Sequence, residues 1–248
     1  MADPRTYHYT LPKSRRPSEV TLVEPWYPGV QPHWPNCTTR RSVDPIMGVV
    51  AVVIHATAGS SSAGAVSVIK RAVNPASFHW LVPDEDEAQH GHFVWACVPE
   101  ALAAWHVRNG ATHPEVNNGA SRVNHWSLGI EVVNAQVNDP FSAWQVEATA
   151  RIVRHCWAKY PNLMHVVSHA KLDPGRRTDP GEHFDWPRFK SLVLDAASEP
   201  LPALVAAIGA DALYCLRRYE PHGRAVDEAL ATALAPDCAM HVVPGNLL

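Results

Sequence analysis

The chain has 248 residues and a formal net charge of −3, with 46% apolar and 18% charged residues. This composition is that of a globular protein and excludes a chain too polar to bury a core. The charge excludes the basic surface typical of a nucleic-acid-binding protein, so no nucleic-acid partner is expected. The length fits one main domain with extensions.

The cysteines and the N-terminus indicate the cellular compartment. No CxxC pair occurs among the five cysteines, which indicates reduced thiols and neither a disulfide framework nor a structural zinc knuckle. The first residues contain no apolar signal-peptide core, and no apolar stretch reaches ~18 residues. We therefore expect no membrane span and a cytoplasmic location.

The first half of the chain changes character at Gly48. Residues 1–45 are rich in Pro, Arg and Trp, which predicts an irregular N-terminal arm. The run VVAVVIH then predicts a strand covered on both faces. Residues 62–73 carry apolar side chains at helical spacing, at Val66, Ile69 and Val73. Strands are predicted over 77–82 and 92–98, joined by an acidic loop.

The second half continues the alternation of strands and helices. After a polar loop over 106–125, a strand is predicted over 127–134 and an amphipathic helix over 142–160. A strand over 164–169 and a helix over 186–197 follow. The pattern predicts an α/β fold, with a catalytic domain over 46–197. In the C-terminal extension over 198–248, residues 201–219 and 225–234 are predicted to form two helices.

Three side chains predict an open zinc site. His55 and His169 each follow an apolar run, and the ends of neighbouring strands in α/β folds project side chains into one crevice. Asp179 follows ten residues after His169, in a loop rich in Pro and Gly, and would reach the same point. A catalytic zinc takes three such imidazole and carboxylate ligands and leaves a fourth position for water. The sequence therefore indicates a metallohydrolase, although each histidine taken alone also fits a packing role.

Other polar residues are candidates for catalysis or substrate binding. Glu131 interrupts an apolar strand, so it is either a general base or an edge residue facing water. Arg177 cannot give up its proton usefully, so its role is either to stabilise an oxyanion or to form a structural salt bridge. His79 and His106 lie on or beside predicted strands, where they either line a substrate cleft or pack in the core.

The motifs also occur in the order found in a known family. Along the chain stand VVIHATAG, ASFHWLV, CVPEALAAWH, SLGIEVVN and SHAKLDPGRRTDPGEHFDW. Together they resemble the zinc-dependent N-acetylmuramoyl-L-alanine amidases, a superfamily that includes phage lysozyme-type amidases and animal peptidoglycan recognition proteins. The resemblance covers about residues 48–197. It implies a central mixed sheet flanked by helices, with zinc in a surface cleft.

The resemblance also implies roles for individual residues. The family's three zinc ligands correspond to His55, His169 and Asp179. Glu131 corresponds to the catalytic carboxylate of the bacterial branch, and Arg177 stands where lysine is usual. His106 belongs to the WH pair of the family and is a candidate substrate contact, but Val107 and Arg108 replace the small residue and glycine that normally follow. An aspartate as third ligand, in place of cysteine, resembles the recycling and phage-type enzymes.

The reaction implied by the resemblance is hydrolysis of the amide between N-acetylmuramic acid and the L-alanine of the stem peptide. The implied partners are peptidoglycan or muropeptide fragments, and the implied cofactor is Zn²⁺. Two alternatives remain open. The chain is either an enzyme or a non-catalytic peptidoglycan-binding module, and an enzyme would be either a recycling amidase or a phage endolysin released through a holin. The sequence carries no signal for an oligomeric state.

Overall fold

A computed structural model describes residues 3–18, 20, 22, 24–136, 139–194, 212–216 and 239–243. The chain divides into two compact units, Met1–Val193 and Leu194–Leu248, which are described separately. Among the described helices, none combines the length and the apolar character needed to cross a membrane. The predicted organisation into an arm, a catalytic domain over 46–197 and an extension stays a prediction.

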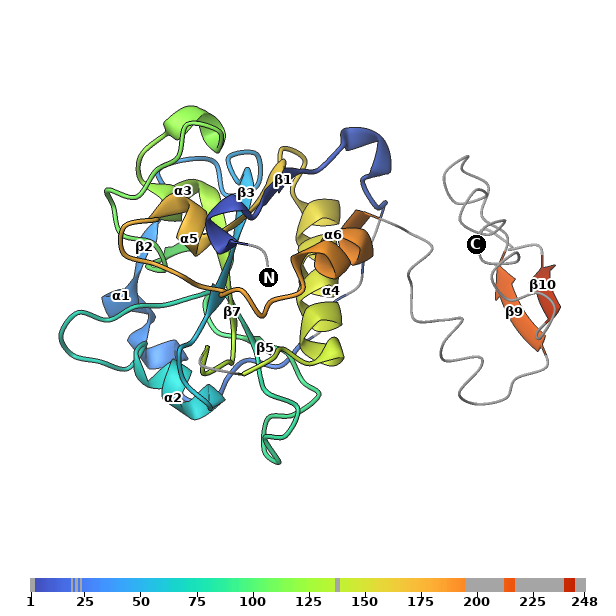
Figure 1. Cartoon of the computed structure of the whole chain (residues 1–248), viewed down its shortest axis with the longest axis horizontal. Helices are drawn as coiled ribbons and strands as arrows, with labels where there is room; N and C mark the ends of the chain where they lie inside the picture. Colours follow the sequence, from blue (N-terminus) through green and yellow to red (C-terminus); the bar gives the residue numbers. More distant parts are fainter. Residues whose placement is uncertain are drawn as a thin grey trace. The chain divides into compact units, whose positions relative to one another are not determined.

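Six strands form one mixed sheet in the first unit, in the order β1-β8-β3-β7-β4-β5 (Figure 1). Their bounds are β1 His8–Thr10, β3 Ala51–Ala56, β4 Trp80–Val82, β5 Trp95–Ala96, β7 Ser127–Val132 and β8 His165–Ser168. The four central strands are parallel, whereas β1 and β5 are antiparallel to their neighbours. The predicted α/β fold with a central mixed sheet is therefore confirmed.

The two middle strands, β3 and β7, position the functional face of the sheet. Every residue of β3 is buried, as expected for a strand that has neighbours on both sides and covered faces. In the parallel pairing, Val53 lies opposite Gly129 and His55 opposite Glu131. Because side chains alternate between the two faces of a sheet, these four residues share one face. His55 and Glu131 therefore lie together near the carboxyl ends of their strands.

Two longer helices pack beside each other, α4 (Ala143–Lys159) and α6 (Trp186–Leu194) (Figure 1). A capping box at Ser142 and Gln145 starts α4 by satisfying backbone N–H groups at its first turn. Arg154 of α4 donates a hydrogen bond of 3.1 Å to the carbonyl of Val193 in α6. The shorter helices are α1 Trp34–Cys37, α2 Ser62–Ser67, α3 Val123–Trp126 and α5 His169–Leu172. Single 3-10 turns occupy Pro4–Thr6, Lys13–Arg15, Gln31–His33 and Asn117–Gly119.

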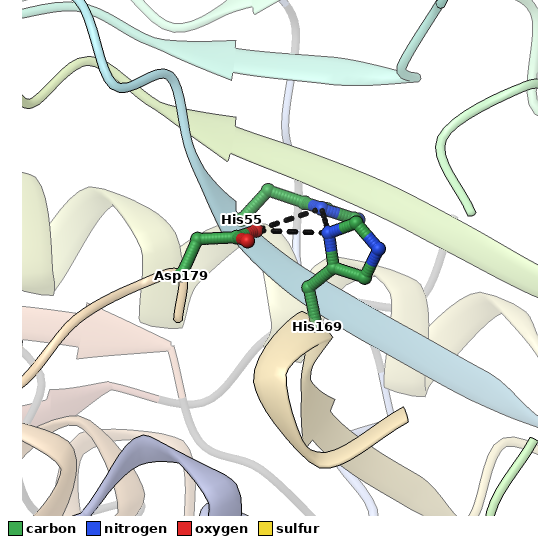
Figure 2. A group of neighbouring side chains, drawn as sticks. All are labelled: His55, His169 and Asp179. Atoms are coloured by element: carbon green, nitrogen blue, oxygen red, sulfur yellow. Dashed lines mark hydrogen bonds and ion pairs between the residues drawn. The ribbon is translucent and has the colours of Figure 1, made fainter. Parts of the chain in front are cut away.

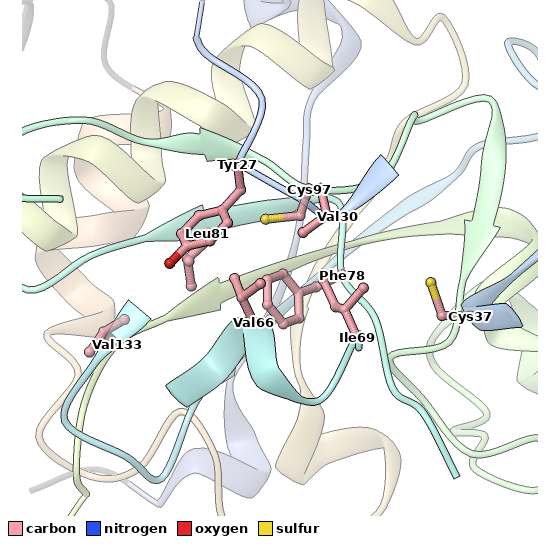
Figure 3. Close-up of a cluster of buried hydrophobic side chains, with 9 residues drawn as sticks. All are labelled: Tyr27, Val30, Cys37, Val66, Ile69, Phe78, Leu81, Cys97 and Val133. Atoms are coloured by element: carbon pink, nitrogen blue, oxygen red, sulfur yellow. The ribbon is translucent and has the colours of Figure 1, made fainter. Parts of the chain in front are cut away.

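One core cluster joins the N-terminal segment to α2 and the sheet (Figure 3). Its buried members are Tyr27, Val30, Cys37, Val66, Ile69, Phe78, Leu81, Cys97 and Val133. Three of these side chains precede residue 45, so the N-terminal segment belongs to the folded core. Cys37, Cys97 and Cys156 are free and buried, which agrees with the reduced thiols expected at these positions.

The structure differs from the expected elements in the N-terminal half. Residues 1–45 contain two strands: β1 extends the central sheet, and β2 (Thr38–Arg40) pairs antiparallel with β6 (Leu102–Ala104). The helix expected over 62–73 is α-helical only to Ser67, because the next N–H groups bond three residues back, as in Ile69 N to Val66 O at 3.0 Å. Val73 is 74% exposed and does not join the core.

The prediction of a helix over 201–219 in the C-terminal extension is wrong for the residues of that segment that the structure describes. Strand β9 (Ala212–Leu216) lies inside the segment expected to be helical and pairs in parallel with β10 (Ala239–Val243). Helical spacing of apolar residues did not reveal a strand whose partner comes later in the chain. The second predicted helix, over 225–234, lies outside the described residues.

A buried carboxylate, Glu100, ties the sheet to the end of α4. Its oxygens accept hydrogen bonds of 2.8 Å from Trp80 Nε1 and from Tyr160 Oη, and Lys159 Nζ lies 2.5 Å away. Burial alone would raise the pKa of Glu100, but the Lys159 charge and these hydrogen bonds lower that pKa to about 2. The carboxylate therefore stays ionised in the folded protein at acid pH.

This lowered pKa predicts a specific loss of stability in acid. In the unfolded chain Glu100 takes up a proton near its usual pKa of 4.5, whereas the folded chain binds that proton only near pH 2. The contribution of Glu100 is thus fully present above pH 4.5 and is lost as the pH falls towards 2. We expect the free energy of unfolding to decline more steeply across this window in wild type than in Glu100→Gln. Denaturant titrations at several pH values measure both slopes, and equal slopes would contradict the assignment.

Candidate metal centre

The three predicted ligands meet at the carboxyl ends of β3 and β8 (Figure 2). His55 comes from β3, His169 is the first residue of α5 directly after β8, and Asp179 comes from the loop that follows α5. His169 Nδ1 lies 3.0 Å from His55 Nδ1 and 3.0 Å from Asp179 Oδ2. His55 Nδ1 lies 3.3 Å from the same carboxylate oxygen. All three side chains are buried.

Local backbone bonds hold this arrangement. Ser168 caps α5 by accepting a hydrogen bond of 3.0 Å from the Lys171 N–H, which fixes the turn that presents His169. The N–H of Ala170 donates to the carbonyl of Asp179 at 2.9 Å, so the loop carrying Asp179 is tied to the start of α5. The three side chains therefore approach one point, although His55 precedes His169 by 114 residues.

The donor set fits a divalent cation. Two imidazole nitrogens and a carboxylate oxygen face one point, and such nitrogen and oxygen donors suit zinc. Burial and, to a smaller extent, the neighbouring His169 lower the pKa of His55 to about 4. Burial opposes ionisation of Asp179, but hydrogen bonds from His169 and His55 hold its pKa below the usual value. At neutral pH His55 is therefore neutral and Asp179 is charged, which are the forms a metal requires.

Glu131 and Arg177 lie within electrostatic range of this cluster. Burial raises the pKa of Glu131, the charge of Asp179 raises it further, and the charge of Arg177 lowers it. No hydrogen bond to the Glu131 carboxylate is found among the described residues, so its oxygens are available to a substrate or to water. Arg177 is exposed, and within the described ranges it forms no ion pair, so the expected alternative of a structural salt bridge finds no support.

A cavity of about 700 Å³ adjoins the cluster. It is lined by polar and aromatic side chains, including those of Asn74, Trp105, His106, Arg108, His125 and Arg177. His106 connects the cavity to the cluster, because its Nδ1 lies 3.0 Å from His55 Nε2. A ligand in this cavity would therefore meet the positive charge of Arg177, whereas the charge of Arg108 is paired with the carboxylate of Asp173.

The two histidines expected to bind substrate occupy different environments. His106 lines the cavity, and both of its ring nitrogens are engaged by other side chains, so its contact with a substrate stays a prediction. His79 is fully buried and is not part of the cavity wall. Its Nδ1 accepts a hydrogen bond from the Gly129 N–H, and its Nε2 lies 3.1 Å from the carbonyl of Leu102. This placement corrects the expectation for His79, whose position is that of a core residue.

Sequence reasoning missed several residues that support the site. The buried guanidinium of Arg41 donates hydrogen bonds to the backbone carbonyls of Glu100, Asn124, His125 and Ser127. Its sequence position gave no signal, because all four carbonyls belong to distant segments. Gly129 did carry a signal, since a glycine inside a strand often marks a close approach by another group. A Cβ atom there would lie 2.6 Å from His106 Cγ.

Comparison with known proteins identifies related chains. Escherichia coli K12 N-acetylmuramoyl-L-alanine amidase AmiD is 30% identical over 159 residues, which is 60% of this chain and 55% of AmiD. Salmonella typhimurium 1,6-anhydro-N-acetylmuramyl-L-alanine amidase AmpD is 35% identical over 97 residues, which is 39% of this chain and 49% of AmpD. The chain thus spans about half the length of the curated relatives it matches.

The structural comparison agrees with the sequence comparison. A crystallised complex of E. coli AmiD with the substrate anhydro-N-acetylmuramic acid-L-Ala-D-γ-Glu-L-Lys superposes with a TM-score of 0.50 and 25% identity. The similarity covers 79% of this chain and 85% of that one. The family model described as N-acetylmuramoyl-L-alanine amidase matches residues 46–182, more than half of the chain and including all three converging residues. The chain therefore belongs to the N-acetylmuramoyl-L-alanine amidase family.

Proposed function

We propose that this chain is a zinc-dependent amidase that hydrolyses the bond between N-acetylmuramic acid and L-alanine in peptidoglycan or muropeptides. The observation that carries the proposal is the convergence of His55, His169 and Asp179 on one point beside Glu131. The adjoining cavity and the family membership support it. Acting on soluble fragments, the enzyme would serve recycling, and acting on the wall it would be an endolysin. The cytoplasmic location expected from the sequence stays a prediction.

The three converging side chains would hold the ion, while Glu131 and Arg177 act on the substrate. A bound zinc ion supplies a Lewis acid that polarises the scissile carbonyl and makes water a nucleophile near neutral pH. Glu131 takes a proton from the attacking water as the new C–O bond forms. It then delivers this proton to the amide nitrogen as the C–N bond breaks, which releases the peptide amine and the lactyl carboxylate. Arg177 stabilises the negative charge that develops on the carbonyl oxygen.

The electrostatics of the site favour this use of Glu131. A base must be ionised to accept a proton, and burial works against ionisation of this carboxyl group. The charge of Arg177 lowers the pKa of Glu131, and the charge of a bound cation acts in the same direction. Because desolvation also stabilises the protonated form, Glu131 keeps the proton it has taken until the more basic amide nitrogen accepts it as the C–N bond breaks.

The proposal is tested by product analysis with Glu131→Gln. Zinc-loaded wild type is incubated with intact sacculi and, separately, with purified anhydro-muropeptides, and the products are identified by mass spectrometry. We expect free stem peptides from at least one substrate. We expect Glu131→Gln to retain zinc but to lose about 100- to 10,000-fold in kcat/KM, since it can no longer accept the proton.

The possible outcomes separate the candidate functions. Product from anhydro-muropeptides alone identifies a recycling enzyme, whereas product from sacculi identifies a lytic one. Binding to sacculi without any product from wild type would overturn the hydrolase proposal and leave a peptidoglycan-binding module. Glu147→Gln is the matched control, because it makes the same chemical change on the exposed side of α4, where Glu147 pairs with Arg188.

A further inference from the structure

The nitrogen of His55 that faces away from the cluster begins a chain of hydrogen bonds. His55 Nε2 lies 3.0 Å from His106 Nδ1, and His106 Nε2 lies 3.2 Å from Ser127 Oγ. Ser127 Oγ in turn donates a hydrogen bond of 2.7 Å to the carbonyl of Val123. His106 and Ser127 thus connect the cluster to the backbone carbonyl of Val123 at the start of α3.

The last bond in this chain fixes the direction of the others. A carbonyl oxygen only accepts, so the single proton of the Ser127 hydroxyl is used towards Val123. Ser127 Oγ must then accept from His106 Nε2, which therefore carries a proton. A neutral imidazole protonated at Nε2 has a lone pair at Nδ1, so His106 Nδ1 accepts from His55 Nε2–H. This leaves Nδ1 of His55 without a proton, and Nδ1 is the atom that faces His169 and Asp179.

We propose that His106 and Ser127 are positioning residues that set the tautomer and ring orientation of His55 for metal binding. This inference rests on the proposed function, because it assumes that the cluster holds a cation. Ligating histidines generally donate their second N–H to another protein group, and loss of that partner typically weakens metal affinity by about 10- to 100-fold. Here the partner of His55 is a second imidazole, whose own protonation is set by a serine.

The surrounding structure holds His106 in place for this task. The side chain of Asn124 bonds both backbone polar groups of Val107, the residue that follows His106. It accepts a hydrogen bond from Val107 N at 2.9 Å and donates one to Val107 O at 2.7 Å. Gly129 leaves room for the imidazole, since any Cβ atom there would lie 2.9 Å from His106 Nδ1. The backbone next to His106 is thus fixed by Asn124, and the imidazole ring packs against Gly129 of β7. Both contacts limit rotation of the ring away from His55.

The test measures zinc affinity by competition with a chromophoric chelator, so it does not depend on amidase activity. His106→Leu removes the acceptor, and we expect its zinc affinity to be about 10- to 100-fold weaker than that of wild type. Ser127→Ala keeps the imidazole but removes the group that fixes its tautomer, and we expect a loss near the lower end of this range. His106→Asn retains an acceptor oxygen near the position of Nδ1 and should recover most of the affinity. His113→Leu, away from the cluster, should bind as wild type does.

Nitrogen-15 NMR of the imidazoles gives a second readout. In zinc-loaded wild type we expect the His55 proton on Nε2 with slow solvent exchange, and in Ser127→Ala we expect faster exchange. If wild type binds no zinc, the proposed metal site fails. If wild type binds zinc but His106→Leu and Ser127→Ala match its affinity and exchange rate, only the positioning role fails. If His106→Leu does not fold, the zinc affinity and exchange rate of Ser127→Ala decide whether the positioning role holds, because this variant removes only one buried oxygen.

Discussion

Replacement of Asp179 by alanine is expected to remove nearly all amidase activity. Asp179 supplies the carboxylate of the cluster and is the member that draws both imidazoles together, with contacts of 3.0 Å to His169 and 3.3 Å to His55. Loss of a group that merely supports a metal ligand costs about 10- to 100-fold in affinity, so loss of a ligand itself should cost more than about 100-fold. Zinc content after dialysis and kcat/KM on anhydro-muropeptides measure the effect.

Two further variants make this prediction specific. Asp179→Cys provides a thiolate that zinc accepts readily, so we expect it to retain far more zinc than the alanine variant. Asp86→Ala removes an exposed carboxylate from a distant loop and should leave both zinc content and kcat/KM unchanged. An Asp179→Ala protein that still holds one zinc per chain with wild-type affinity would show that the ion is bound elsewhere.

Replacement of Arg41 by alanine is expected to cause a large loss of stability. The guanidinium is buried, and it bonds four backbone carbonyls at distances between 2.9 and 3.1 Å. Each buried acceptor left without a partner costs about 1–3 kcal/mol. Even if water reaches some of these carbonyls, we expect the free energy of unfolding to fall by more than about 3 kcal/mol. Urea denaturation followed by tryptophan fluorescence measures this change.

The neighbouring arginine provides the control. Arg40 is exposed on β2, so Arg40→Ala should change the free energy of unfolding by less than about 0.5 kcal/mol. If Arg41→Ala does not fold, Arg41→Lys keeps the positive charge but has fewer donors, and an intermediate loss is expected. A change below about 1 kcal/mol in Arg41→Ala would mean that solvent satisfies the four carbonyls.

The sequence predicted the elements whose signals are local. His55 is the next-to-last residue of the apolar strand β3, His169 directly follows β8, and α4 shows a clear helical period, so each of these elements could be recognised from neighbouring residues. Strand β1 could not, because three residues carry no period and its partner β8 lies more than 150 residues later. Strand β9 was missed for the same reason, since its pairing with β10 is not visible within its own segment.

The cluster of His55, His169 and Asp179 was predictable from the sequence, and its supporting residues were not. His55, His169 and Asp179 carry donor chemistry that stands out at strand ends and in a Gly-rich loop. Ser127 and Asn124 are ordinary polar residues whose roles depend on contacts with His106 and Val107. His79 is the opposite case: its residue type suggested a functional role, but its side chain is fully buried in the core. Donor type is a property of one residue, whereas support and burial depend on the whole fold.

The place of β1 at the edge of the sheet bears on how this chain could be shortened or fused to other domains. A fragment cut to residues 46–182 would lose both β1 and α6. It would also lose the stacking of Tyr7 on Trp186, whose ring centroids are 4.8 Å apart. Strand β8 would then become an edge strand with unpaired backbone groups next to His169, and exposed edge strands promote association between copies. Engineered chimaeras should therefore retain the first ten residues together with the helix they cover.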